Sequence, residues 1–285
     1  MADGGSDATM DFGPGSVAVV TGGASGIGLA LCEQLAAAGC AVVVADVDVE
    51  GARAVAAGLG GGEALAVGVD VADLGSVQAL ADAAVSRFGQ VDLLFNNAGV
   101  STFNLLRDQT LDDWRWVIDV DLWGVVHGLQ TFVPILRAQG TPAHIVNTSS
   151  MGGVMGGLPF IGPYAAAKAA VVSLSETLAA ELAMYQEPIG VSVLCPGSTL
   201  TNIMESERVR PAAFGVEQRT ADSEGLRLAI KDSFSGATGL PASTVAERTL
   251  QAVRERRFWI FPHASERGIV EARVERMLDA FPATN

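Results

Sequence analysis

The sequence predicts an α/β fold: a single domain with a doubly wound parallel β-sheet and helices on both faces. Short β-branched apolar runs, typical of strands buried on both faces, alternate with helical patterns that end in glycine. The chain has 285 residues, 49% of them hydrophobic, which is enough for one large core. Polar and glycine-rich stretches follow the strands, at the edge of the sheet where such folds bind ligands.

Composition narrows the choice of partner. Lys and Arg number 18 against 32 Asp and Glu, and the net charge of -14 disfavours nucleic acids and anionic membrane surfaces. Cys32, Cys40 and Cys195 show no CxxC or Cys/His spacing, so we expect buried thiols, no metal and a reducing, cytoplasmic compartment. No apolar run approaches ~20 residues, so no transmembrane helix is expected. Residues 1–14 are small, polar and acidic and do not read as a signal peptide; we expect a disordered tail before one domain over 15–285.

The first predicted strand, residues 17–20, leads into a glycine-rich turn at 21–28 and a helix over 29–38. This order is what a dinucleotide site requires, because glycines let the backbone approach a pyrophosphate whose charge the free N–H groups of the helix favour. A glycine turn without a ligand is the alternative. The residues expected to contact the cofactor here are Gly22, Ser25, Gly26, Ile27 and Gly28.

Asp46 follows the second predicted strand, residues 41–45, and lies 18 positions after Gly28. A carboxylate about 20 residues past the glycines accepts hydrogen bonds from the adenosine ribose hydroxyls and repels a 2′-phosphate. Neither Ser25 nor Val47 supplies a compensating cation, so we expect NAD rather than NADP. The alternative is a carboxylate that simply faces water.

The alternation of strands and helices continues along the chain. The patterns predict helices over 49–59, 73–88, 110–138, 164–185, 241–256 and 265–281, and strands over 64–71, 91–95, 144–148, 189–194 and 258–261. Residues 202–240 are charged and contain several glycines, which predicts a mobile lid over the substrate. The strand at 258–261 is expected at an edge that could pair across a subunit interface.

Tyr164 and Lys168 are four positions apart in an alanine-rich helix, so their side chains lie on one face. An ammonium close to a phenol favours the phenolate and lowers a pKa that starts near ~10. Ser149 or Ser150, at a strand end, would hold the oxygen that gains or loses the proton. This trio predicts acid/base chemistry on an alcohol or carbonyl, and a surface Tyr/Lys pair is the alternative.

These motifs, in this order, resemble those of the short-chain dehydrogenase/reductase family. They are the glycine turn at 21–28, Asn-Asn-Ala-Gly at 96–99, the serine pair at 149–150 and Tyr164-x3-Lys168, and the resemblance covers residues 15–205. It implies a Rossmann-like fold, a nicotinamide cofactor and a homotetramer built on the helices that begin near Thr110 and Tyr164. It adds to the expected cofactor site Asp70, Val71, Asn97, Ala98, Gly99, Tyr164, Lys168, Pro196, Gly197, Thr199 and Thr201.

The resemblance also implies catalytic roles for Ser150, Tyr164 and Lys168, with Ser150 as the second serine of the family's Ser-Ser-x-x-Gly pattern. Where the family has an Asn that holds a water in the proton path from the lysine, this chain has Asp121. Asp121 could substitute if the backbone carbonyl does most of the work, or its carboxylate could retune the proton relay. Asp121 is therefore a fourth catalytic candidate.

The expected function is the NAD-dependent interconversion of a secondary alcohol and a ketone, with a small molecule as the partner. The alternatives are a catalytically silent NAD sensor or scaffold, and an epimerase or dehydratase that uses NAD transiently. Several apolar side chains favour an alicyclic or steroid-like substrate, although they could equally belong to the core. They are Met151, Val154, Met155, Leu158, Phe160 and Met204.

Overall fold

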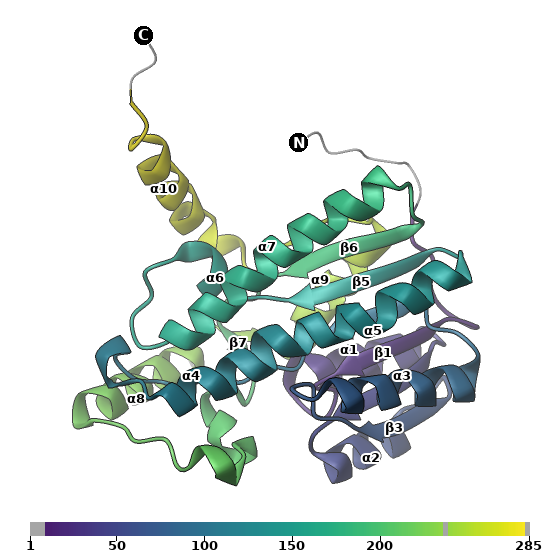
Figure 1. Cartoon of the computed structure of the whole chain (residues 1–285), viewed down its shortest axis with the longest axis horizontal. Coiled ribbons are helices and arrows are strands. Elements are labelled where there is room, and N and C mark those ends of the chain that lie inside the picture. The colour runs from purple at the N-terminus through teal and green to yellow at the C-terminus, as the bar shows by residue number, and fades with distance from the viewer. Residues whose placement is uncertain (1–8, 236–238, 283–285) are drawn as a thin grey trace.

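A seven-stranded, fully parallel sheet forms the centre of the molecule (Figure 1). The computed structural model describes residues 9–235 and 239–282, and its strands lie in the order β3-β2-β1-β4-β5-β6-β9. The order reverses between β1 and β4, which makes this the switch point where doubly wound sheets bind ligands. The strands are β1 (Val17–Thr21), β2 (Ala41–Asp46), β3 (Ala64–Gly68), β4 (Leu93–Asn96), β5 (Ala143–Thr148), β6 (Ile189–Leu194) and β9 (Trp259–Ile260).

Helices cover both faces of the sheet, as the sequence predicts. Figure 1 shows α3, α5 and α7 in front of the sheet and α1 and α9 behind it. Successive residues of a strand serve opposite cores: Val19 packs with the front helices, and Val20 packs with those behind. The helices are α1 (Gly26–Ala37), α2 (Val49–Gly58), α3 (Leu74–Phe88), α4 (Leu111–Ile118), α5 (Gly124–Gln139), α6 (Met151–Met155), α7 (Gly162–Met184), α8 (Ala221–Ser235), α9 (Ala242–Arg254) and α10 (Arg267–Leu278).

The predicted helix over 110–138 is interrupted. A π-helical turn at Asp119–Trp123 joins α4 to α5. Helix α4 begins with a capping box, in which Thr110 and Asp113 exchange side-chain-to-backbone hydrogen bonds. The sequence pattern did not mark the π turn, because the apolar spacing on either side of it stays helical. Its importance is that it carries Asp121.

Short elements on either side of the main helices were not predicted. Helix α6 follows Ser150 directly, and β7 (Thr199–Leu200) pairs with β8 (Leu240–Pro241) in a small second sheet. Helix α7 begins at Gly162 rather than at Tyr164, because Pro163 has a fixed φ that suits the first helical turn. The strand predicted over 258–261 is β9, and it lies at the sheet edge as expected.

The N-terminal segment departs from the predicted tail. Residues 1–8 of that tail lie outside the described residues, but residues 9–14 are packed on the domain. Met10 and Phe12 are buried, Met10 N donates to Arg254 O (2.8 Å), and the Arg254 guanidinium lies 4.0 Å from the centroid of the Phe12 ring. Two large apolar side chains among small polar neighbours anchor this segment, each by about 1.5–3 kcal/mol of burial.

The part of the chain described here contains no helix long and apolar enough to cross a membrane. Helix α10 projects away from the rest of the molecule (Figure 1), and none of its residues is buried. The segment predicted as a lid contributes two 3₁₀ segments, η3 (Ile203–Val209) and η4 (Ala212–Phe214), followed by α8.

Candidate functional site

A cavity of about 650 Å³ opens at the carboxyl ends of the strands and is lined on one side by residues from the segment 202–226. It unites the glycine turn, the ends of β2, β4, β5 and β6, the start of α7 and the lid. Of the residues predicted to bind the cofactor, it is lined by Gly22, Ser25, Gly26, Ile27, Asp46, Asp70, Val71, Asn97, Ala98, Gly99, Tyr164, Lys168, Pro196, Gly197, Thr199 and Thr201.

The backbone of the glycine turn has a conformation that residues with a side chain rarely adopt. Gly22 and Gly26 have φ of +66° and +55°, the left-handed region that favours glycine. Gly28 does not line the cavity; a Cβ there would lie 2.1 Å from Gly22 O, so Gly28 lets α1 approach the turn. The Asn97 side chain donates to Thr21 O (3.0 Å) and ties β4 to the turn.

Helix α1 presents free N–H groups to this cavity. Ser25, its N-cap residue, makes no capping hydrogen bond with its side chain, and the first turn holds no acidic residue. The following helices differ, since Asp48 caps α2 and Asp73 caps α3. Uncapped N–H groups and the positive end of the helix dipole suit an anion, so this chain fits the pyrophosphate of a dinucleotide.

Asp46 is held at the far end of the same cavity. One carboxylate oxygen accepts from Ala24 N (2.9 Å) and the other accepts from Asp48 N (2.9 Å). Both bonds fix the side chain beside the glycine turn, and each oxygen retains a lone pair for a further donor. The geometry fits two ribose hydroxyls.

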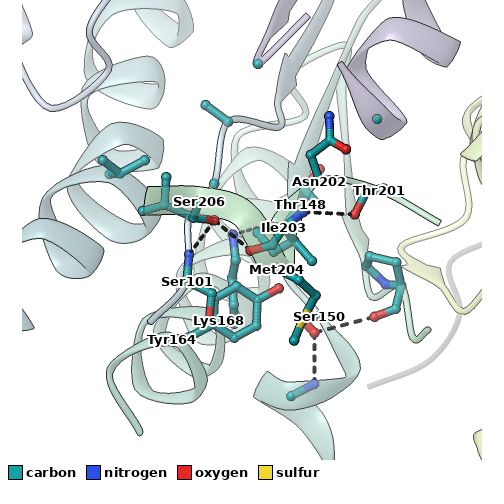
Figure 2. Close-up of a pocket in the computed structure, with 18 of the residues that line it drawn as sticks. Ser101, Thr148, Ser150, Tyr164, Lys168, Thr201, Asn202, Ile203, Met204 and Ser206 are labelled. Carbon is teal, nitrogen blue, oxygen red and sulfur yellow. Dashed lines mark hydrogen bonds between the residues drawn. The ribbon is translucent and has the colours of Figure 1, made fainter. Parts of the chain in front are cut away.

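Tyr164 and Lys168 project from α7 toward the cavity (Figure 2). Lys168 is almost fully buried, donates from Nζ to Thr148 O (3.0 Å), and lies 5.6 Å from the centroid of the Tyr164 ring. The hydroxyl of Ser149 donates its proton to Lys168 O (2.7 Å), and this hydrogen bond ties the end of β5 to α7. Both serines line the cavity. Ser150 accepts from Gly152 N (3.0 Å) and donates to Pro196 O only over 3.4 Å, so of the two hydroxyls it is the one freer to turn to a substrate.

Asp121 lies behind Lys168 and does not line the cavity. Its Oδ2 is 3.1 Å from Lys168 Nζ, its Oδ1 accepts from Val100 N (2.8 Å), and both side chains are almost wholly buried. The backbone at Gly99 passes close to this pair, and a Cβ there would lie 3.3 Å from Lys168 Nζ and 3.4 Å from Asp121 Oδ2. The departure from the family's Asn thus produces a buried ion pair in direct contact with the predicted active site.

The ion pair acts on the phenol of Tyr164. Burial raises the pKa of Tyr164, the Lys168 ammonium lowers it, and the Asp121 carboxylate raises it again. Burial alone would lower the pKa of Lys168, but Asp121 and Tyr164 outweigh burial and raise it. Lys168 therefore stays charged, while Asp121 offsets part of the effect of that charge on the phenol.

The predicted substrate residues divide into two groups. Met151, Met155, Leu158 and Met204 line the cavity, whereas Val154 packs in a small core cluster and Phe160 does not reach the cavity. Sequence reasoning missed several lining residues from segments far apart in the chain: Ser101, Phe103, Trp116, Ser206, Arg208 and Val209.

The segment predicted as a lid is held by contacts with residues about a hundred positions earlier in the chain. Ser206 Oγ accepts from Ser101 N (3.1 Å), as Figure 2 shows. The Arg210 guanidinium forms a buried ion pair with Asp113 (2.8 Å) and lies over the Trp116 ring at 5.0 Å. Loop residues 100–116 and the lid thereby form one wall of the cavity.

Arg210→Leu is expected to open the lid without unfolding the sheet. The substitution leaves Asp113 buried without its cation, a strongly unfavourable state that lid opening relieves by admitting water. Limited proteolysis should cut within 202–240 several-fold faster than in the wild type, with little change in Tm. The exposed pair of Arg87 and Glu63 provides the control, because Arg87→Leu should change neither quantity. An unaltered cleavage rate for Arg210→Leu would show that the pair does not hold the lid.

The three cysteines are expected to be inert in the folded protein. All are buried, and burial raises the pKa of Cys32 and Cys195 to about 12 and that of Cys40 to about 11. At pH 8 almost no thiolate forms, and the thiolate is the reactive species. A chromogenic disulfide reagent should titrate none of the three thiols in the native protein and all three in denaturant. Rapid native labelling of Cys195, which lies near Lys168, would contradict this.

The chain is similar to known proteins over most of its length. A family model described as short chain dehydrogenase matches residues 16–211. A C alpha-dehydrogenase from a Sphingobium species is 38% identical over 267 residues, covering 93% of this chain and 86% of that protein. The 3beta-hydroxysteroid dehydrogenase 2 of Eggerthella lenta is 34% identical over 238 residues, which cover 81% of this chain and 89% of that protein.

The fold also has a close counterpart among solved structures. A short chain dehydrogenase/reductase from Burkholderia phymatum, crystallised in complex with NAD, superposes with a TM-score of 0.89. The two chains share 40% identity, and the alignment covers 97% of this chain and 99% of the other. The likeness therefore extends over the lid and the C-terminal elements as well as over the strands.

Proposed function

The chain belongs to the short-chain dehydrogenase/reductase family, and from that premise we propose that it interconverts a secondary alcohol and a ketone with NAD. The family and its oxidoreductase chemistry on hydroxyl groups are established by the matches. The cofactor, the substrate and the residue roles are our proposal. The observation that carries it is that one cavity brings the expected cofactor and catalytic groups together. The cavity is lined by Asp46, Ser150, Tyr164 and Lys168, and the uncapped start of α1 lies at its wall.

Tyr164 is the proposed acid/base. In the oxidative direction its phenolate takes the proton of the substrate hydroxyl, and in the reductive direction its phenol returns one to the carbonyl oxygen. NAD supplies the acceptor for the hydride that leaves the same carbon, so the alcohol loses one proton and one hydride in all. Ser150 donates a hydrogen bond to the substrate oxygen and fixes the carbon for transfer.

Lys168 and Asp121 act behind Tyr164. The Lys168 ammonium favours the phenolate, and its hydrogen bond to Thr148 O holds it beside the ring. We assign Asp121 a positioning role, since it contacts Lys168 and not the cavity. Because its carboxylate raises the pKa of Tyr164, it makes the phenol a weaker acid than a neutral Asn would.

Asp46 supports NAD as the cofactor. Its carboxylate, fixed by two backbone N–H groups, is placed to accept from ribose hydroxyls and to repel a 2′-phosphate. The structural counterpart from Burkholderia phymatum was crystallised with NAD, which supports the same choice.

The substrate is proposed to be apolar, alicyclic or steroid-like. Three methionines and Leu158 give the cavity flexible apolar walls, and Trp116 adds a flat one. One relative acts, by its name, on 3β-hydroxysteroids, which supports this class.

The test is absorbance at the reduced-nicotinamide band with NAD or NADP and a panel of secondary alcohols from cyclohexanol to hydroxysteroids. Signal with NAD alone would support the reaction and the role of Asp46. Signal with NADP alone would overturn the choice of cofactor and leave the reaction standing. NAD binding without turnover of any alcohol would favour a silent sensor.

We also propose a homotetramer that works in the cytoplasm. Trp123 and Leu111 are 49% and 71% exposed on the segment α4–α5, and Met184 and Tyr185 are exposed at the end of α7. Large apolar side chains exposed on these helices support the interface expected there. Light scattering coupled to size exclusion gives the mass, and Trp123→Glu should lower it if this face is the interface.

A further inference from the structure

The arginines of the lid are paired with carboxylates, with one exception. Arg210 pairs with Asp113, Arg219 with Glu207 and Glu217, and Arg227 with Glu224. Arg208 has no carboxylate within 4 Å among the residues that the structure describes. Its guanidinium instead donates to Ser25 Oγ (3.3 Å), 183 positions away, and it lines the cavity.

The backbone on both sides of Arg208 is anchored. Two residues before it, Ser206 accepts from Ser101 N; two residues after it, Arg210 is buried in its ion pair. Just before this segment, the Thr201 methyl lies where a Cβ on Gly26 would approach it at 3.1 Å. Residues 201–210 are thus packed beside the glycine turn, and Arg208 lies between two anchored positions.

The surroundings of Arg208 indicate what it would bind. Its guanidinium stands beside Ser25, the first residue of the uncapped end of α1. Both features favour an anion, although the chain has a net charge of -14 and Asp46 lies in the same cavity. A guanidinium with planar N–H donors matches phosphate oxygens in particular. Sequence reasoning found no cation near Ser25, since the cation comes from the lid.

We propose that Arg208 binds the pyrophosphate of the dinucleotide, so that the lid closes on the cofactor through this residue. The inference rests on the proposed function. A 2′-phosphate would offer the same chemistry, but Asp46 would repel it, and the pyrophosphate is the phosphate that the start of α1 also favours.

The test compares Arg208→Gln with the wild type in binding, without turnover. Calorimetry would give Kd for NAD, for NADP and for ADP-ribose, which has the pyrophosphate but no nicotinamide. Arg208→Gln should weaken NAD and ADP-ribose equally, by about ten- to a hundredfold, the effect of one hydrogen bond to a charged group. ADP-ribose should also protect the lid of the wild type from proteolysis and protect the variant much less.

The control is Lys231→Gln, which removes one positive charge from the same lid. Lys231 pairs with Glu205 (2.5 Å) and does not line the cavity, so its loss should leave each Kd within about twofold of the wild type. Equal affinities for Arg208→Gln and the wild type would overturn the inference and leave the proposed function intact. A loss confined to NADP would overturn the pyrophosphate assignment in favour of the 2′-phosphate. Failure of the wild type to bind NAD and ADP-ribose would instead refute the proposed function.

Discussion

Tyr164→Phe is expected to lower turnover by at least about a hundredfold while Kd for NAD stays close to that of the wild type. The substitution removes only the phenolic oxygen, and the ring keeps its packing against the cluster of Val100, Trp116 and Val117. Without that oxygen no group that touches the substrate can take or return the proton. Single-turnover kinetics on the best alcohol from the panel and calorimetry with NAD measure the two quantities.

The control for this variant is Tyr185→Phe. Tyr185 is 68% exposed at the end of α7 and carries the same hydroxyl outside the cavity, so its loss should leave turnover unchanged. If Tyr164→Phe keeps more than a tenth of wild-type turnover, another group transfers the proton, and the role of Tyr164 must be abandoned.

Asp121→Asn is expected to move the pH–rate profile of alcohol oxidation toward acid. Oxidation requires the phenolate, so the rate rises as pH passes through the pKa of Tyr164. Asp121 raises that pKa, and removing its charge lowers it, provided that Lys168 stays protonated. Lys168 keeps its hydrogen bond to Thr148 O, an acceptor that favours the charged ammonium because the ammonium is a stronger donor than the neutral amine.

The matched control is Asp119→Asn, which removes another carboxylate from the same π turn. Among the described residues, Lys168 pairs with Asp121 and not with Asp119. Its profile should coincide with that of the wild type. A shift of the Asp121→Asn profile toward alkaline pH would mean that Lys168 loses its proton without Asp121. In that event Asp121 serves to keep the lysine charged, and our account of its effect on Tyr164 is wrong.

Much of the fold was predictable because its signals are local. The β-branched runs, the glycine turn and the capping residues each depend on a few neighbouring positions, and β1 to β6 follow them. The site follows from the same signals, because parallel strands bring their carboxyl ends to one edge. Gly22, Asp46, Asn97 and Tyr164 therefore meet in one cavity although they are far apart in sequence.

What the sequence did not reveal depends on contacts between distant segments. The partner of Arg210 is Asp113 and that of Ser206 is the backbone of Ser101, and no local pattern pairs them. The position of Asp121 marked it as a departure from the family, but its distance from Lys168 depends on the π turn. Residues 9–14 were misread because two buried side chains weigh little in a tail rich in glycine and aspartate.

The contact of Met10 with Arg254 sets an order of events during synthesis. The partners of β1, which are β2 and β4, are complete once residue 96 has left the ribosome. Residues 9–14 must wait for α9, which is more than two hundred positions later. Residues 9–14 are thus made long before the helix on which they pack, and until α9 forms Met10 and Phe12 lack part of the surface that buries them.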